Sequence, residues 1–308
     1  MPIEMRTSYD KLFFEDRMPA LEEISYAEWE KHPDLIEKMF NTDTMDQEIK
    51  QQLTMGEIPP AQQVAEGADV PYVELLQGYN KTYTALTYKL GIQCSEELYE
   101  DDRQDLVNKF HRGLARGHYQ TRQIIGAGVY NDSFTSAVGP DGKELVATDH
   151  PLVNGGTGSN ELEVPTAFGV AGLEAIIQLF SEMVDEQGLP VLNTPRLVII
   201  PPKLQFTAKR IIDSPGKADE ANLAINAFNM YDLTFMWNPY LSAAQGGSDT
   251  AYWVIGDTAD LDIMWYDRVS FSLEVGKDFD SGGTKTKTRQ RFVTGWHDWR
   301  NIGGTAGA

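Results

Sequence analysis

The sequence predicts an α+β protein, in which helices pack against short, buried strands. Three patterns indicate this. Residues 183–212 contain a helix end, a four-residue apolar run and a helix that starts at prolines; the stretch after Ser95 repeats apolar residues at steps of three or four; and strand patterns dominate the chain beyond Pro215. Helices and strands are therefore both expected, with the strands concentrated toward the C-terminus.

The first 50 residues predict an arm rather than a unit with a core of its own. Their one amphipathic segment runs from about Ala27 to Phe40 and is interrupted by Pro33, and no strongly apolar strand follows it. An arm of this kind must pack against something outside itself.

Residues 56–80 predict an extended excursion, because glycines and prolines are frequent and large apolar side chains are scarce before Tyr72. Residues 82–94 then alternate apolar and mixed side chains, as a strand returning from a long loop does. A loop of about 30 residues with so little apolar surface cannot fold alone, so a neighbouring subunit could supply the missing contacts.

Acidic residues followed by apolar residues at helical spacing predict a long helix after Ser95, reaching at least Ile124. Gly113 and Gly117 lie inside it, and each costs about 1 kcal/mol relative to alanine in a helix interior. We therefore expect another stretch of backbone to pack closely against both glycines.

The middle of the chain predicts loops followed by a helix, a strand and a second helix. Residues 126–165 are rich in Gly, Asn, Asp and Ser; a helix is then expected from Thr166 until Gly188 stops it. Leu197–Ile200 form an apolar run suited to a strand buried on both faces, and the two prolines that follow favour the first turn of a helix. Four strand patterns come later: YDLTFMWNPYL, AYWVIGD, DIMWYD and VSFSLEV.

Charge and composition exclude several functional classes. The formal net charge is −20, and residues 1–102 hold 22 acidic against 8 basic residues, so a sequence-reading nucleic-acid binder is disfavoured. The single cysteine, Cys94, excludes an intramolecular disulfide framework, and no apolar run is long enough to cross a membrane. The N-terminus lacks the features of a signal peptide, which indicates synthesis in a reducing cytoplasm.

The order of the elements resembles the major capsid proteins of tailed bacteriophages, which have the Hong Kong 97-like fold, and most nearly their Mu-like head-subunit branch. Four stretches carry the resemblance, which covers nearly the whole chain: VAEGADVPYVELLQGYNKTYTALTYKLGIQCSEELYEDD, ATDHPLVNGG, DEQGLPVLNTPRLVIIPPKLQFTAKRIIDSP and the final HDWRN. The first is similar to that family's extended loop running into its long spine helix. The resemblance implies five regions: an N-terminal arm (1–50), an extended loop with flanking strands (51–94), a peripheral domain with the spine helix (95–166), an axial domain (167–280) and a C-terminal strand returning to the peripheral domain (281–308).

The resemblance also implies a function and a set of partners. We expect a structural protein without catalytic activity, cofactor or metal, which self-assembles as pentamers and hexamers into an icosahedral shell around double-stranded DNA. Portal, scaffolding and decoration proteins are the implied partners, with no membrane, and the implied location is the virion, after assembly in the host cytoplasm. Scaffolding would come from a separate protein or a processed precursor. Some relatives join shell subunits covalently through a loop lysine, but Lys81 alone does not predict such a cross-link.

Six residues are candidate contacts between subunits. In an expected strand near the C-terminus, threonines alternate with three cations, which places the cations on one face. Either these charges protect a solvated edge strand from aggregation, or they contact the acid-rich arm or loop of a neighbouring subunit. The candidates are Glu66, Tyr72 and Lys81 in the loop region, and Lys285, Lys287 and Arg289 in the strand.

Two other functions stay open. A bacterial nanocompartment shell would share the resembled fold, and a cytosolic α/β enzyme could use Asp149 and His150 as an acid–base pair. Adjacent residues on an extended chain point in opposite directions, however, and Pro151 favours a turn there. The remaining candidates for chemistry have ordinary structural interpretations: a packed or solvated His111 and His118, a buried Cys94, and a C-terminal anchor at Trp296 and Trp299.

Overall fold

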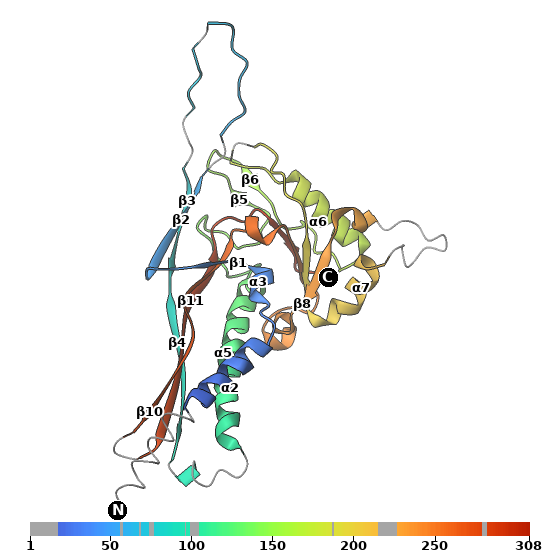
Figure 1. The fold of residues 1–308 in the computed structure, drawn as a ribbon. Helices are drawn as coiled ribbons and strands as arrows, with labels where there is room; N and C mark the ends of the chain where they lie inside the picture. Colours follow the sequence, from blue (N-terminus) through green and yellow to red (C-terminus); the bar gives the residue numbers. More distant parts are fainter. Residues whose placement is uncertain are drawn as a thin grey trace, which may run out of the picture.

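The structure is a computed structural model that describes residues 18–55, 58–67, 69–73, 77–95, 97–98, 105–186, 188–214, 227–278 and 282–308. Figure 1 shows an elongated molecule: a long sheet and a long helix run side by side down one half, a second sheet with its helices forms the other half, and a loop projects from one end. The α+β prediction is confirmed.

The long sheet has four strands in the order β1-β10-β11-β4. Strand β1 (Asn41–Thr44) runs parallel to β10 (Ile263–Lys277), while β11 (Thr284–Trp296) is antiparallel to both β10 and β4 (Leu86–Cys94). The two strand patterns expected around 262–275 merge into the single strand β10, whose register against β11 shifts between Asp267 and Ser272. One continuous antiparallel ribbon thus replaces two short strands.

Helix α5 (Leu106–Asn131) is the long helix that the sequence predicts, and it lies along the inner face of the long sheet. Its glycines do not have the expected backbone neighbours. A Cβ at Gly117 would lie 2.9 Å from the Leu90 side chain, and nothing lies within 4 Å of such an atom at Gly113. Close packing therefore accounts for Gly117 through a side chain, and it does not account for Gly113.

The described part of the N-terminal arm packs against α5 of its own chain. Helix α2 (Met18–Lys31) is joined to it by Glu28, which accepts from Arg116 at 2.7 Å, and Trp29 stacks on Phe271 of β10 at 5.0 Å between ring centroids. The short helix α3 (Ile36–Met39) follows Pro33 and buries its apolar side chains. Residues 1–17 of the expected arm lie outside the described residues.

The second sheet has the strand order β12-β9-β7-β8. Its strands are β7 (Leu197–Ile200), β8 (Thr234–Trp237), β9 (Tyr252–Ile255) and β12 (Ile302–Thr305). Strand β7 has the predicted bounds, and the prolines after it lead into η2 (Pro202–Leu204) and α7 (Gln205–Ile212), as predicted. The remaining short elements are β5 (His150–Pro151), β6 (Thr157–Gly158), η3 (Ala227–Tyr231), η4 (Pro239–Leu241), η5 (Ala243–Gln245) and η6 (Thr258–Asp260).

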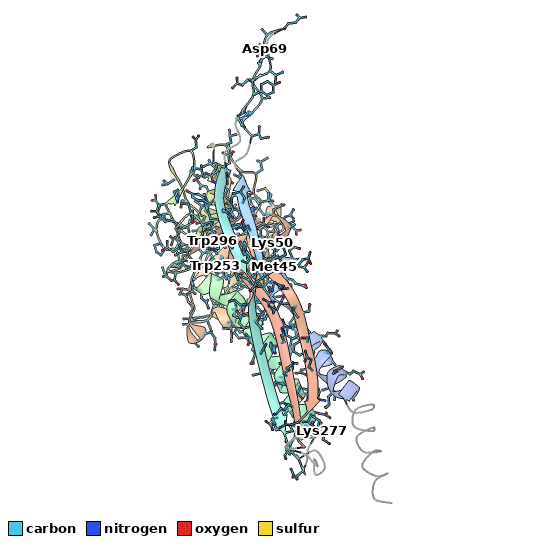
Figure 2. The ribbon with its side chains drawn as sticks, turned by 90° about the vertical axis from the view of Figure 1, so that its left-hand side faces the viewer. Met45, Lys50, Asp69, Trp253, Lys277 and Trp296 are labelled. Atoms are coloured by element: carbon cyan, nitrogen blue, oxygen red, sulfur yellow. The ribbon has the colours of Figure 1, made fainter. Side chains whose placement is uncertain are left out.

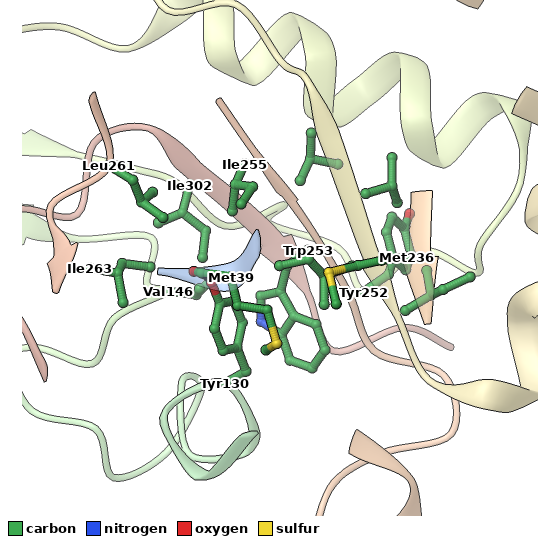
Figure 3. Packing of buried hydrophobic residues seen from close by; sticks show 14 of the residues in the cluster. Met39, Tyr130, Val146, Met236, Tyr252, Trp253, Ile255, Leu261, Ile263 and Ile302 are labelled. Atoms are coloured by element: carbon green, nitrogen blue, oxygen red, sulfur yellow. Dashed lines mark hydrogen bonds between the residues drawn. The ribbon is translucent and has the colours of Figure 1, made fainter. Parts of the chain in front are cut away.

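The second sheet lies between two layers. Helix α6 (Val170–Glu182) covers one face, where a Cβ at Gly303 would lie 3.0 Å from the Phe180 ring. On the opposite face the Trp253 ring meets Tyr130, from the C-terminal end of α5, edge-on at 5.6 Å (Figure 3). The Trp253 indole N–H donates to the Ser133 hydroxyl. The main hydrophobic core is thus shared by α5 and both sheets.

Helix α6 is shorter than predicted at both ends. It begins at Val170 rather than Thr166 and ends at Glu182, six residues before Gly188. The backbone turns extended at Met183, and Val184 then bridges to Pro190, so Gly188 with its φ of 81° belongs to a turn beyond the helix. The positive φ explains the glycine, although not as the helix stop that the sequence suggested.

Candidate functional site

The extended loop stands on a two-stranded stalk formed by β2 (Ile49–Met55) and β3 (Gln77–Thr84). Side chains clamp this stalk to the outer face of the long sheet. Tyr83 is buried edge-on against Tyr266 at 5.1 Å, Gln52 donates to the Tyr266 hydroxyl at 2.8 Å, and the Lys50 ammonium lies over the same ring. The stalk is therefore an integral part of the body (Figure 2).

Further hydrogen bonds fix the stalk where the loop leaves the body. The Tyr79 hydroxyl donates to the Pro151 carbonyl and the Thr54 hydroxyl to the His297 carbonyl, both at 3.3 Å. The Tyr83 hydroxyl lies 3.2 Å from Nδ1 of His297, and Nε2 of that ring lies 3.0 Å from Asp262. The direction in which the loop projects is consequently set by the folded body.

Beyond the stalk the described loop residues, 58–67 and 69–73, have no helix or strand and almost no burial. They carry apolar side chains into solvent: the exposed fraction is 95% for Tyr72, and Ile58, Val64, Val70 and Val73 are exposed as well. Glu66 lies in this exposed segment too. A cluster of exposed apolar residues on a protruding segment is typical of a surface that another molecule covers.

Lys81 differs from the other loop candidates, because it lies on the stalk and turns toward the body. Its ammonium is 3.5 Å from the Val138 carbonyl, beside a hollow of about 370 Å³ that Trp296 and Asp132 also line. Burial lowers the pKa of the Lys81 ammonium. Lys81 therefore contacts the body of its own chain in the isolated subunit.

The C-terminal cations do lie on one face of a strand, but the edge-strand interpretation is wrong. Strand β11 is internal, between β10 and β4, and the edge strands of the sheet are β1 and β4. In β11, Thr284, Thr286 and Thr288 face α5 and are buried. Lys285 and Lys287 are exposed on the outer face, and Arg289 is half-buried. Lys285 pairs with Asp278 at 3.0 Å and Lys287 with Glu274 at 2.6 Å.

Asp149 and His150 do not form an acid–base pair. Asp149 is at the surface beside Lys143, whereas the His150 ring is fully buried, with Nδ1 2.7 Å from Asp141. The ring stacks on Trp299 at 4.6 Å between centroids. The structural interpretation agrees with this geometry, but the turn was placed too early: His150 and Pro151 form the strand β5, and the turn follows at residues 153–154.

The HDWRN stretch forms a buried polar anchor that sequence reasoning did not identify. The Arg300 guanidinium binds Asp298 at 2.8 Å and Glu186 at 2.9 Å, and it lies over the Trp299 ring. Glu186 in turn accepts from the backbone N–H of Val153. Burial raises the pKa of Asp298, and the neighbouring Arg300 opposes this effect. In the sequence, the one hint of this anchor is that Asp298 and Arg300 lie two residues apart in HDWRN.

The histidines of α5 have structural surroundings. His111 is fully buried, with Nδ1 2.8 Å from the Val107 carbonyl and Nε2 3.1 Å from the Thr286 hydroxyl, and His118 meets the Phe271 ring. Within the described ranges, no group of three or more His, Cys, Asp or Glu side chains is arranged to hold a metal ion. Cys94 is buried, as expected. No helix in that same part of the chain is both long and apolar enough to span a membrane.

Comparison with known proteins identifies the family. Residues 78–302 match the family described as phage capsid protein, which is well over half of the chain. The chain belongs to the phage capsid protein family. The match includes α5, nearly all of the stalk strand β3 and the strands of both sheets except β1, and it ends at the first residue of β12. The protein is accordingly a structural, major capsid protein, a component of the virion that assembles into an oligomeric shell.

Solved structures share the fold of this capsid protein. The capsid structure of Cyanophage P-SCSP1u superposes with a TM-score of 0.57 at 13% identity, over 89% of this chain and 88% of that one. A structure from Microbacterium phage Oxtober96 gives 0.56 at 10% identity, over 90% and 92%. A virus-like particle from Pyrococcus furiosus gives 0.56 at 8% identity, over 94% and 99%. The Hong Kong 97-like fold expected from the sequence is confirmed. No curated protein matches the sequence.

Proposed function

We propose that this capsid protein is the principal subunit of an icosahedral head that encloses the double-stranded DNA of a tailed phage, and that the extended loop is its main assembly element. The observation that carries this proposal is the contrast between stalk and tip. Hydrogen bonds and the buried Tyr83 fix the stalk to the body, while Tyr72 and Val70 at the tip are exposed. A shell subunit needs apolar surface that is exposed in the single subunit and becomes buried against its neighbours. The loop has this property, and the stalk fixes its direction.

We assign a different set of contacts between subunits to each of the five regions expected from the sequence. The arm (1–50), the loop region (51–94) and the peripheral region (95–166) would make the contacts around the rim of a capsomer, and residues 167–280 those near its axis. The pairing of β10 favours placing its residues with the peripheral region instead, because β10 pairs with β11, which in turn pairs with β4. Strand β12, in contrast, pairs with β9 of the second sheet, so residues 281–308 would serve both regions.

The finer expectations complete the proposal. The subunits form pentamers and hexamers in the host cytoplasm, with portal and scaffolding proteins and decoration proteins as partners, and the mature head packs DNA without reading its sequence. The protein has no catalytic activity in this proposal, which the buried state of His150 supports. The Mu-like branch rests on the order and spacing of the four sequence stretches. A nanocompartment shell is the second candidate, because the virus-like particle from Pyrococcus furiosus has a similar fold; the phage capsid family match favours the head protein.

Sedimentation velocity and negative-stain electron microscopy of the purified chain test the proposal directly. The wild-type chain should form capsomers or closed shells. Val70→Ser/Tyr72→Ser should leave a folded subunit that no longer assembles. Val164→Ser/Leu192→Ser is the matched control, since these side chains are similarly exposed, at 71% and 98%, and it should assemble normally. A wild-type chain that stays monomeric under all assembly conditions would contradict the proposal.

A further inference from the structure

The outer face of the long sheet brings three cations together. The register places Arg289 of β11 directly opposite Lys89 of β4, and Lys287 is the next outward residue along β11. Like charges directly opposite in neighbouring strands are destabilising. The Glu274 carboxylate lies beside them: Lys287 lowers its pKa most, and Arg289 and Lys89 contribute to the same shift. Lys89, Lys287 and Arg289 are called the cation patch below.

Two members of the cation patch are not balanced within the chain. Glu274 pairs with Lys287 at 2.6 Å, and within the described ranges neither Lys89 nor Arg289 forms an ion pair. The Nε atom of Arg289 is buried without a hydrogen-bond partner there. A guanidinium with an unused donor beside a second cation is suited to binding a carboxylate.

The patch is also open to another molecule. Helix α5 lies on the inner face of the sheet, and among the described residues the β2–β3 stalk covers the end of the outer face near Tyr266. Figure 2 looks onto the outer face and shows β4, β10 and β11 running bare below the stalk, toward Lys277. Lys89 and Lys287 are accordingly exposed, and Arg289 is half-buried between them.

Acidic side chains lie at the end of the loop, from where they could reach the cation patch of a second copy. Its net charge is −20, and Glu66 and Asp69 are exposed at the end of the loop farthest from the stalk (Figure 2 labels Asp69). Nine extended residues, such as 58–66, span about 30 Å, so the tip reaches well beyond its own body. The tip of one copy and the sheet of another therefore have complementary charges and matching accessibility.

We propose that the cation patch binds the Glu66 and Asp69 carboxylates at the loop tip of a second copy of this chain. The inference rests on the proposed assembly function and names the surface that receives the loop. The Arg289 guanidinium and the Lys89 ammonium bind the incoming carboxylates, and Lys287 remains with Glu274. The contact relieves the repulsion between the two cross-strand cations and places the apolar residues beside Glu66 and Asp69 against the neighbouring subunit.

Charge reversal and charge exchange test the contact. In Lys89→Glu/Arg289→Glu, the subunit concentration required for assembly should rise at least tenfold, as measured by sedimentation velocity. Lys209→Glu/Arg210→Glu on α7 makes the same change in charge at two exposed positions and should assemble as the wild type does. Adding Glu66→Lys/Asp69→Lys to the first variant should restore assembly. Thermal unfolding of the unassembled subunits checks that each variant is folded.

A second experiment covers the case in which the reversed variant does not fold. Lys89→Cys/Asp69→Cys in a Cys94→Ser background should give disulfide-linked ladders on oxidation of assembled shells, and either cysteine alone should not. Normal assembly of folded Lys89→Glu/Arg289→Glu, absence of rescue, or absence of ladders would each overturn the inference while leaving the proposed function in place. Failure of the wild-type chain to assemble would overturn both.

Discussion

At the scale of single residues, two glycines of α5 show how closely the helix meets the rest of the molecule. A Cβ at Gly126 would lie 2.3 Å from Cδ1 of the buried Ile36 and 3.6 Å from the Trp265 ring, whereas nothing lies within 4 Å of such an atom at Gly128. Gly126 thus allows α3 and β10 to approach the helix. Gly128 has no such role, so its low helix propensity is not compensated by packing.

The first prediction compares the two alanine variants. Gly128→Ala should raise the free energy of unfolding by up to about 1 kcal/mol, because alanine is the better helix former. Gly126→Ala should lower it by about 1–3 kcal/mol, because the added methyl overpacks a site with little room to move. Urea unfolding of the unassembled subunit measures both. Equal effects of the two substitutions would show that Ile36 moves away without cost.

The second prediction concerns His118. Burial lowers the pKa of both His111 and His118, so the folded state takes up a proton less readily than the unfolded chain. Stability should therefore be unaffected by these groups above pH 6.5 and should fall as the pH drops below it, by up to about 1.4 kcal/mol per unit of pKa lowering. His118→Met should lose part of this acid sensitivity. The check is the difference in unfolding free energy between the variant and wild type from pH 7 to pH 5; parallel curves would contradict the prediction.

At the scale of elements, the boundaries that could be predicted are those marked by prolines and glycines in the sequence. Strand β7 was placed correctly because prolines follow its last apolar residue, and the loop was recognised from its glycines and prolines. The end of α6 was misplaced, because the bridge between Val184 and Pro190 is a tertiary contact that ends the helix before Gly188. Such contacts have no local signal in the sequence.

In the candidate site, too, local features were predicted and contacts between distant segments were not. Alternation in β11 correctly separated the cation face from the threonine face, because side-chain direction is a local property of a strand. It did not reveal that β11 is internal, nor that Lys89 stands opposite Arg289, because strand neighbours are set by pairing between segments about 200 residues apart. A structural role for His150 was predicted, whereas its place in the strand β5 and its partner Asp141 were not.

The third prediction concerns the docking of α2. Trp29 stacks on Phe271 and meets Tyr119 of α5 edge-on at 6.4 Å. Trp29→Ala should release α2 without unfolding the body, and its amides should exchange at least tenfold faster, since a stacked aromatic pair and its buried area contribute about 2 kcal/mol or more. Hydrogen exchange with peptide-level readout measures this. Glu30→Ala, an exposed change on the same helix, is the control. Equal acceleration in α5 would mean that the two helices open together.

At the scale of the whole molecule, the packed core is separate from the surfaces that are exposed in the single subunit. The core joins α5 to both sheets, and the stalk is clamped to that core, while the loop tip and the outer face of the long sheet end in solvent. The stability of the subunit and its capacity to assemble therefore depend on different residues. Substitutions at the tip should change assembly alone, and those at the core, such as at Gly126, should change both.

The fourth prediction follows from the charge of the whole chain. A shell built from subunits with a net charge of −20 presents a predominantly acidic surface, so naked duplex DNA should bind assembled empty shells weakly. The logarithm of the binding constant should change little with the logarithm of salt concentration, because few phosphates would be neutralised by lysine or arginine. Filter binding between 50 and 200 mM salt, with a basic DNA-binding protein as the positive control, measures the slope. A steep negative slope would contradict the prediction, because it would mean that lysine and arginine side chains are concentrated on a surface that binds DNA. Packing and release of the genome would then have to overcome this attraction.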